Sequence, residues 1–260
     1  MATGTLPLTR IALDIQPPTA RLTLDHPPLN VIEIAMMDEL AQALAAIEAR
    51  HDVSTVILSG AGKAFSVGVD VAAHTPDRVE SMLAKFHAVI RAVVGSRKAM
   101  IAAVHGHCLG GGAELAMVCD LVYTAETATW GFPEIKLGCY PPVAATALAA
   151  LVGPRRAAEL ILTGRSITGA EAARVGLANR AVADTEVAAA VQEAVQQLSK
   201  LSPAVLAITK KANYAWDSMH FDKGLARAEK VYLEELMKTD DVHEGINAFL
   251  EKRVPAWKWK

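Results

Sequence analysis

Several features are scarce in this chain of 260 residues, and each scarcity disfavours a class of protein. Aromatic residues make up 5% of the sequence, charged residues 21%, and the formal net charge is −2 at pH 7. Proteins that bind polyanions usually carry a marked excess of lysine and arginine, so we expect no nucleic-acid partner. The cysteines are odd in number and lack C-x-x-C spacing: Cys108, Cys119 and Cys139. Buried, reduced thiols are therefore expected in place of a disulfide framework or a zinc site.

Long uninterrupted apolar runs are also missing. Residues 99–123 are rich in apolar side chains, but Glu114, Asp120, two histidines and four glycines interrupt them, so we predict no membrane span. The first seven residues lack a basic region followed by an apolar core, which predicts no signal peptide. A hydrophobic content of 52% is enough for one large domain, or for a domain with a small appendage. The default expectation is an enzyme of the cytoplasm.

Apolar periodicity predicts alternating strands and helices over the first 150 residues. The early elements are expected as a hairpin over 11–15 and 20–25, helices over 33–49, 76–94 and 110–118, and strands over 53–58, 100–104 and 120–124. Such alternation favours α/β layers around a parallel sheet. Beyond residues 150–153 the pattern becomes almost wholly helical, with helices expected over 155–162, 169–175, 185–201, 203–216, 224–238 and 242–252.

The run Gly110-Gly111-Gly112-Ala113-Glu114 is the most informative motif in the chain. A helix that begins here has unpaired backbone N–H groups and partial positive charge at its first turn. Glycine lets a ligand oxygen approach that backbone closely, which makes the turn a candidate oxyanion hole. Alternatively, the glycines serve only tight packing of helix on strand, and the spacing by itself favours neither interpretation.

Two glutamates accompany this turn. Glu114 lies in the first helical turn among apolar neighbours, where it is favoured by the helix dipole but also needs a partner or a function. Glu134 follows twenty residues later, and alone it would be typical of a surface turn. Taken together, the backbone donors and the two carboxylates predict a site that polarises a carbonyl group and moves protons to and from neighbouring carbons.

Other motifs are excluded by their spacing. The loop over 59–70 follows a buried strand, where α/β sheets place ligands, but Ala64 after Lys63 breaks the nucleotide P-loop pattern. The same loop misses the nucleophile elbow by one residue, so Ser66 is interpreted as structural. The glycine run does not complete G-x-G-x-x-G, which argues against a dinucleotide site. His105 and His107 lack a third ligand, so we expect loop or core histidines.

These segments together resemble the crotonase superfamily of enoyl-CoA hydratases and isomerases. The resemblance covers nearly the whole chain and rests on the segments 26–30, 64–70, 106–120, 130–138, 163–165 and 248–253. It implies an α/β fold with a spiral core of repeated β-β-α turns over residues 1–200. It also implies a helical C-terminal region over 201–260 that assembles a homotrimer or a dimer of trimers.

The resemblance also implies a set of site residues. The thioester oxygen of an acyl-CoA substrate would bind the backbone N–H groups of Val69 and Gly111, with Glu114 and Glu134 as catalytic residues. CoA and substrate contacts are implied for Leu29, Val67, Gly68, Asp70, Gly110, Tyr140 and Lys252. No metal and no separate cofactor are implied, because CoA arrives with the substrate. The presence of both glutamates favours water addition.

Two departures from common family members narrow the resemblance. Pro28 stands where a CoA-contacting lysine is frequent, and residues 139–144 replace a glycine-rich stretch beside the acyl pocket. These features, with segments 74–77, 82–91 and 232–237, resemble the cyclohexa-1,5-diene-1-carbonyl-CoA hydratases. That subgroup implies water addition that gives 6-hydroxycyclohex-1-ene-1-carbonyl-CoA. The alternatives are a straight-chain enoyl-CoA hydratase, a double-bond isomerase, or a non-catalytic crotonase-fold binding protein with a basic RNA-binding face.

Overall fold

The described residues form two sheets, and apolar runs within Thr55–Gly60 and Ala99–Val104 lie inside the larger one. The computed structural model describes residues 8–213 and 218–258. The strand order is β1-β2-β3-β5-β7-β10, with bounds β1 (Ile11–Gln16), β2 (Thr19–Leu24), β3 (Thr55–Gly60), β5 (Ala99–Val104), β7 (Leu121–Ala125) and β10 (Arg180–Val182). The strands from β2 to β10 run parallel, and β1 pairs antiparallel with β2 at the edge. The predicted hairpin and parallel sheet are confirmed.

A second sheet has four short strands in the order β4-β6-β8-β9. Their bounds are β4 (Ala64–Ser66), β6 (His107–Leu109), β8 (Thr129–Gly131) and β9 (Ser166–Thr168). Along the chain, β3 and β4 precede one helix, β5 and β6 a second, and β7 and β8 a third, so each repeat supplies one strand to each sheet. This is the β-β-α spiral, and the predicted fold class is confirmed.

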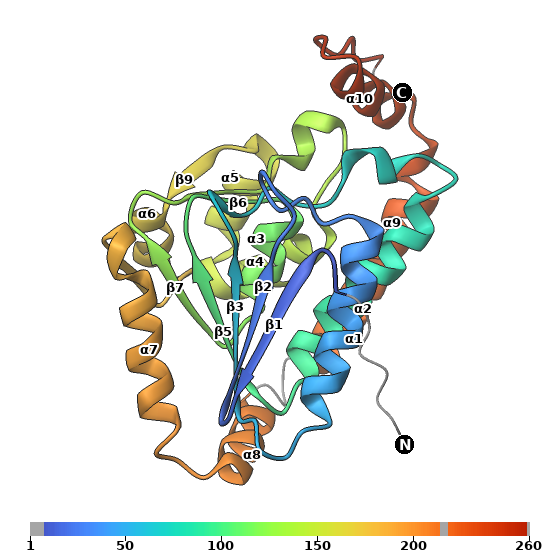
Figure 1. Ribbon diagram of the computed structural model, residues 1–260. Helices are drawn as coiled ribbons and strands as arrows, with labels where there is room; N and C mark the ends of the chain where they lie inside the picture. The colour runs from blue at the N-terminus through green and yellow to red at the C-terminus, as the bar shows by residue number, and fades with distance from the viewer. Residues whose placement is uncertain (1–7, 214–217, 259–260) are drawn as a thin grey trace.

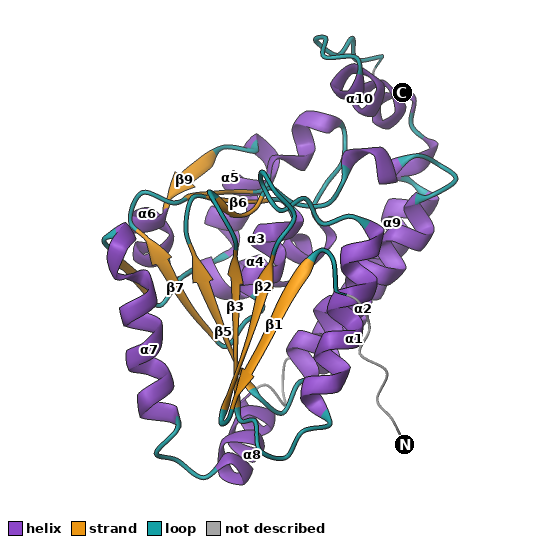
Figure 2. Ribbon diagram, viewed as in Figure 1, coloured by secondary structure: helices purple, strands orange, loops and turns teal. Residues whose placement is uncertain are grey.

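Helices cover the large sheet on several sides (Figures 1 and 2). Their bounds are α1 (Ile34–Glu48), α2 (Val79–Gly95), α3 (Gly111–Met117), α4 (Pro142–Val152), α5 (Pro154–Thr163), α6 (Gly169–Arg174) and α7 (Val187–Leu198). Helix α1 lies beside β1 with α2 packed against it, and α7 lies beside β7 (Figure 1). Each buries a stripe of residues three or four positions apart, as Met36, Leu40 and Leu44 do in α1.

The last part of the chain is helical, as expected. It comprises α8 (Pro203–Asn213), α9 (Ser218–Glu234) and α10 (Asp240–Leu250). The described residues also form four short 3₁₀ segments: η1 (Val71–His74), η2 (Pro133–Leu137), η3 (Asp184–Glu186) and η4 (Leu236–Lys238). The end of the helix predicted over 203–216 falls partly outside the described residues. No helix in the described ranges is long and apolar enough to cross a membrane.

The structure corrects several sequence predictions. The segment 59–70, expected as a loop, contains β4, and β9 and β10 interrupt a region expected to be helical. Three-residue strands are too short to show a period of two, so the sequence pattern carries no signal for them. Helix α4 was not predicted either, because Pro141 and Pro142 were interpreted as backbone restraints. Pro142 occupies the first turn of α4, where its missing N–H has no acceptor to lose.

Asn30 fastens the loop after β2 to the loop after β3. Its buried side chain donates to the carbonyl oxygens of Ala61 (2.9 Å) and Ala64 (2.8 Å), and it accepts from the His26 N–H (3.0 Å). The backbone of Asn30 has a φ of 55°, a left-handed conformation that asparagine tolerates better than most residues. One side chain therefore fixes two loops that are more than thirty residues apart.

We expect Asn30→Ala to lower the free energy of unfolding by about 3 kcal/mol, because several buried carbonyl groups lose a donor and alanine is strained at this φ. Urea denaturation measures the difference. Asn247→Ala, at an exposed position of α10, is the control and should change stability by less than about 0.5 kcal/mol. Equal stability of the two variants would contradict this role for Asn30.

Candidate active site

The backbone at Val69 leaves one N–H group without a partner. Val69 forms a parallel bridge with Ile32, in which Ile32 N–H donates to Gly68 O (2.8 Å) and Asp70 N–H donates to Ile32 O (3.2 Å). Successive residues of extended backbone point their N–H groups to opposite sides, so the Val69 N–H points away from Ile32. Gly111 begins α3, and its N–H has no acceptor within the helix. Neither N–H donates to another described group.

These two donors lie beside each other because the glycines around them have no side chain that would keep the two backbone segments apart. Gly68 has a φ of 102°, and a Cβ added there would lie 3.1 Å from the Gly111 nitrogen. A Cβ added to Gly110, whose φ is 52°, would lie 2.8 Å from Glu134 Oε1. A side chain at either glycine would therefore occupy space next to a donor or a carboxylate. At these two positions the absence of a side chain leaves room for a ligand and also permits close packing.

Glu114 is buried and receives hydrogen bonds from a helix N-terminus. Its Oε1 accepts from the N–H groups of Val143 (2.8 Å) and Ala144 (2.9 Å), in the first turn of α4. Burial raises the pKa of Glu114 to about 7, and these two N–H groups act in the opposite direction. The donors and the dipole of α4 stabilise the ionised form of this carboxylate.

Glu134 lies in η2, and a hydrogen bond from its own backbone N–H favours its ionised form less than burial opposes it. Its Oε2 is buried and has no hydrogen-bond partner among the described residues. Burial, followed by the negative charge of Glu114, raises the pKa of Glu134 well above its ordinary value of 4.5. Since two N–H groups of α4 stabilise ionised Glu114, the first proton taken up by the pair belongs on Glu134. When the pair holds one proton, Glu134 is therefore the acid and Glu114 the base.

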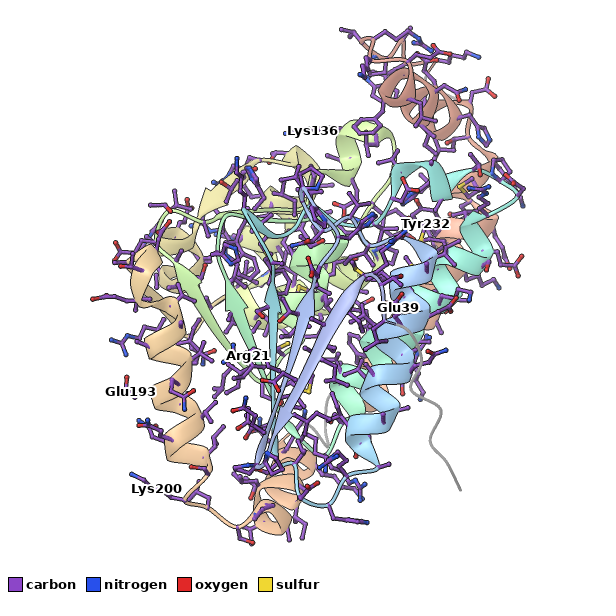
Figure 3. The ribbon with its side chains drawn as sticks, in the orientation of Figure 1. Arg21, Glu39, Lys136, Glu193, Lys200 and Tyr232 are labelled. Atoms are coloured by element: carbon purple, nitrogen blue, oxygen red, sulfur yellow. The ribbon has the colours of Figure 1, made fainter. Side chains whose placement is uncertain are left out.

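Both carboxylates line a cavity of about 80 Å³ that is continuous with a groove of about 570 Å³. Six residues line both spaces: Val67, Gly68, Val69, Val71, Pro133 and Leu137. The free N–H of Val69 therefore lies at the junction. Helix α10, at the top of the molecule in Figure 1, packs against η1 and η2 and closes one side of the groove. Lys136, labelled in Figure 3, lines the groove beneath it.

The structure brings most of the predicted site residues to these two spaces. The cavity is lined by Val67, Gly68, Val69, Gly110, Gly111, Glu114, Glu134 and Tyr140, and Asp70 lines the groove. Leu29 and Lys252 line neither space. The Leu29 carbonyl accepts from Val67 N–H (3.1 Å) behind the lining, and Lys252 is exposed just beyond α10. Its neighbour Arg253 lines the groove instead.

Comparison with known proteins identifies the family. The profile of the enoyl-CoA hydratase/isomerase family matches residues 14–260. The chain belongs to this family. It is 37% identical over 238 residues to a cyclohexa-1,5-dienecarbonyl-CoA hydratase of Thauera aromatica, covering 92% of each chain. It is 38% identical over 240 residues to a probable enoyl-CoA hydratase of Rhizobium meliloti (strain 1021), covering 91% of this chain and 93% of the relative.

Solved structures of the enoyl-CoA hydratase/isomerase family share the fold. An enoyl-CoA hydratase from Mycobacterium avium subsp. paratuberculosis K-10 superposes with a TM-score of 0.87 at 26% identity, over 97% of this chain and all 100% of the other. An enoyl-CoA hydratase/isomerase from Xanthobacter autotrophicus Py2 gives 0.86 at 30% identity, over 95% and 94% of the two chains. The predicted family and the predicted class of enzyme, an enoyl-CoA hydratase-type hydro-lyase, are confirmed.

Ser66, His105 and the three cysteines were also the subject of predictions. Ser66 Oγ donates to Asn30 O (2.7 Å) and accepts from Gly68 N–H (3.0 Å), which confirms its structural role and positions the residue before Val69. His105 Nε2 lies 3.0 Å from Gly62 O. The three cysteines are free and buried, as expected: Cys108, Cys119 and Cys139.

One polar residue of the cavity is not among the predicted site residues. His87 of α2 is 0% exposed and lines the cavity with Glu114 and Glu134. Three buried side-chain atoms in the described residues have no hydrogen-bond partner: His87 Nε2, Glu134 Oε2 and the hydroxyl of Tyr232, which is labelled in Figure 3. The available signal was a histidine on the apolar face of a predicted helix, four residues after Leu83. Such a pattern does not by itself distinguish a core residue from a site residue.

The raised pKa of Glu134 predicts a pH-dependent stability. Between the ordinary pKa of 4.5 and the higher folded value, the folded chain binds more protons than the unfolded chain, so stability falls as the pH rises. Glu134→Gln carries no charge and escapes this loss. We expect the variant to gain stability over the wild type by up to about 1.4 kcal/mol per pH unit above pH 5.

Urea denaturation of both proteins from pH 5 to pH 8 tests this expectation. Glu80→Gln, at an exposed position of α2, is the matched control and should follow the wild type. A constant difference between Glu134→Gln and the wild type across this range would mean that Glu134 does not titrate as described.

Proposed function

We propose that this hydro-lyase adds water to a cyclic conjugated dienoyl-CoA, with cyclohexa-1,5-diene-1-carbonyl-CoA as substrate and 6-hydroxycyclohex-1-ene-1-carbonyl-CoA as product. The observation that carries the chemistry is the unequal pair of carboxylates in the same cavity as two free N–H groups. One carboxylate accepts hydrogen bonds from two N–H groups of α4, and the other has a buried oxygen without a partner among the described residues. Two findings support a cyclic acyl group: the similarity to a cyclohexa-1,5-dienecarbonyl-CoA hydratase, and the segment with Pro141 and Pro142 that lines the cavity.

In the proposed mechanism the thioester oxygen accepts hydrogen bonds from the Val69 and Gly111 N–H groups. These donors stabilise the negative charge that builds on the oxygen when water attacks the conjugated carbon, a contribution of about 10²–10³-fold in rate for each donor. Glu114 takes a proton from the attacking water as the carbon–oxygen bond forms at the ring carbon β to the thioester, and Glu134 gives its proton to the far end of the conjugated diene. The remaining double bond thereby shifts to the carbon that bears the thioester, as in the proposed product. Return of one proton from Glu114 to Glu134 restores the resting pair.

The groove suits the CoA part of the substrate. A thioester whose carbonyl lies at Val69 would place its acyl group in the cavity and the rest of the molecule along the groove. We assign CoA contacts to Val67, Gly68, Asp70 and Gly110, with Leu29 and Lys252 at its margins. The proposed reaction moves protons and no electrons, so CoA enters with the substrate and neither a redox cofactor nor a metal takes part.

The proposal extends to assembly. We propose that residues 201–260 form the contacts of a homotrimer or dimer of trimers, around a core of residues 1–200. Three exposed apolar residues at and within α8 support a protein–protein surface there: Leu201, Val205 and Ile208. The buried, unpaired cysteines support a cytoplasmic location.

Glu114→Gln and Glu134→Gln should each lower kcat for hydration by about 10²–10⁴-fold, because each removes one proton-transfer group while keeping the shape of the side chain. Steady-state hydration assays measure the loss, and circular dichroism shows whether the fold is retained. Glu80→Gln serves again as the control at an exposed carboxylate. Near-normal hydration by both active-site variants would overturn the two-carboxylate mechanism.

The acyl group is tested by a substrate comparison. The purified protein is incubated with cyclohexa-1,5-diene-1-carbonyl-CoA and, separately, with crotonyl-CoA, and the gain of one water is followed by mass spectrometry. We expect faster hydration of the cyclic diene. Preference for crotonyl-CoA would make the protein a straight-chain enoyl-CoA hydratase. No mass gain on either thioester would favour isomerisation, which leaves the mass unchanged.

A further inference from the structure

A histidine that no part of the proposed mechanism uses lines the cavity. His87 is fully buried on α2, and its Nδ1 lies 2.7 Å from Glu229 Oε1 on α9. Its Nε2 has no hydrogen-bond partner in the described part of the chain, and the residue lines the same cavity as both carboxylates. A buried polar atom without a partner at a ligand cavity indicates that the ligand supplies the partner.

The surroundings of His87 determine which role Nε2 can play. Arg91 also donates to Glu229 Oε1 (2.9 Å), which keeps that carboxylate an acceptor. The hydrogen between His87 and Glu229 therefore belongs to Nδ1. Burial lowers the pKa of His87, so the ring is neutral near pH 7. A neutral ring with its hydrogen on Nδ1 offers a lone pair at Nε2, and its ligand must be a hydrogen-bond donor.

The other polar groups of the cavity already have partners or roles in the proposed reaction. One donor therefore remains for His87 Nε2. The N–H groups of Val69 and Gly111 donate, Glu114 receives the reacting proton of water, and Glu134 gives a proton to carbon. Tyr140 directs its hydroxyl to the Ala228 carbonyl on α9, at 2.5 Å. The attacking water has a second O–H, which does not react and becomes the hydroxyl of the product. In a small cavity with mostly apolar walls that O–H needs an acceptor.

We propose that His87 Nε2 accepts the hydrogen bond of this unreacted O–H, first from the attacking water and then from the hydroxyl of the hydroxyacyl thioester. The inference rests on the proposed hydration reaction and adds a residue that recognises the hydroxyl. Glu229 acts through His87 as a positioning residue, since it fixes the ring with the lone pair toward the cavity. The pocket consequently distinguishes a hydroxyacyl group from a saturated acyl group of similar size.

The test compares a hydroxyacyl thioester with a saturated thioester that has no hydroxyl. The cyclic pair is 6-hydroxycyclohex-1-ene-1-carbonyl-CoA and cyclohexane-1-carbonyl-CoA, and the straight-chain pair is 3-hydroxybutyryl-CoA and butyryl-CoA. The pair that matches the better wild-type substrate is used. In His87→Leu we expect the KM of the hydroxyacyl thioester to rise about tenfold and hydration kcat/KM to fall at least as much. The inhibition constant of the saturated thioester should stay within about twofold.

Further variants separate recognition from packing. His87→Gln places an amide oxygen near the position of Nε2 and should restore part of the hydroxyacyl affinity. Glu229→Gln keeps an acceptor for Nδ1 and should resemble the wild type, whereas Glu229→Leu should resemble His87→Leu. Ile90→Val is the control, because Ile90 is buried on α2 but does not line the cavity, and it should leave both constants unchanged.

Two outcomes would overturn the inference. Equal weakening of both thioesters in His87→Leu would mean that His87 only shapes the pocket, and unchanged constants would mean that Nε2 does not meet the hydroxyl. Failure of the proposed function has a different signature, because the wild type itself would then hydrate neither enoyl thioester. In that case the dissociation constants of the same pair, measured by calorimetry, still decide whether His87 recognises the hydroxyl.

Discussion

The site depends on holding two carboxylates out of water in one cavity while a helix N-terminus stabilises one of them. Pro142 has no N–H, so the first donors that α4 can offer are those of Val143 and Ala144, and both reach Glu114. Glu134 lies within the electric field of Glu114, and its Oε2 has no hydrogen-bond partner among the described residues. Low polarity around the pair makes this difference large, because neither charge is screened by solvent.

The backbone donors depend on a second set of contacts, which begins far from the cavity. Asn30 holds the loop after β3, Ser66 binds the Asn30 carbonyl, and the same hydroxyl receives the Gly68 N–H. Gly68 then places Val69 so that its N–H lies beside that of Gly111. These bonds are internal to the fold and need no ligand, so the donors are arranged before substrate binds. Preorganised donors of this kind need no rearrangement as charge develops on the substrate.

The long elements could be predicted because their apolar periodicity extends over several turns or strand residues. Strands and helices before residue 150 match the predicted ranges to within three residues, with α4 and the short strands β4, β6 and β8 as the exceptions. Those strands pair with partners from other repeats, and three residues carry too little pattern to reveal this. Helix α4 was missed because prolines that restrict a chain also suit the first turn of a helix.

The sequence by itself determined the α/β class, the backbone donors of the glycine run, and two glutamates whose spacing and company suggested proton transfer. Tertiary structure decided which glutamate accepts hydrogen bonds from the N–H groups of α4, that Leu29 and Lys252 lie off the lining, and that His87 joins the cavity. The reason is that a carboxyl pKa and an unpartnered nitrogen depend on burial and on groups a few ångströms away. Those neighbours come from α2, α3, α4, α9 and η2, and packing alone brings these elements together.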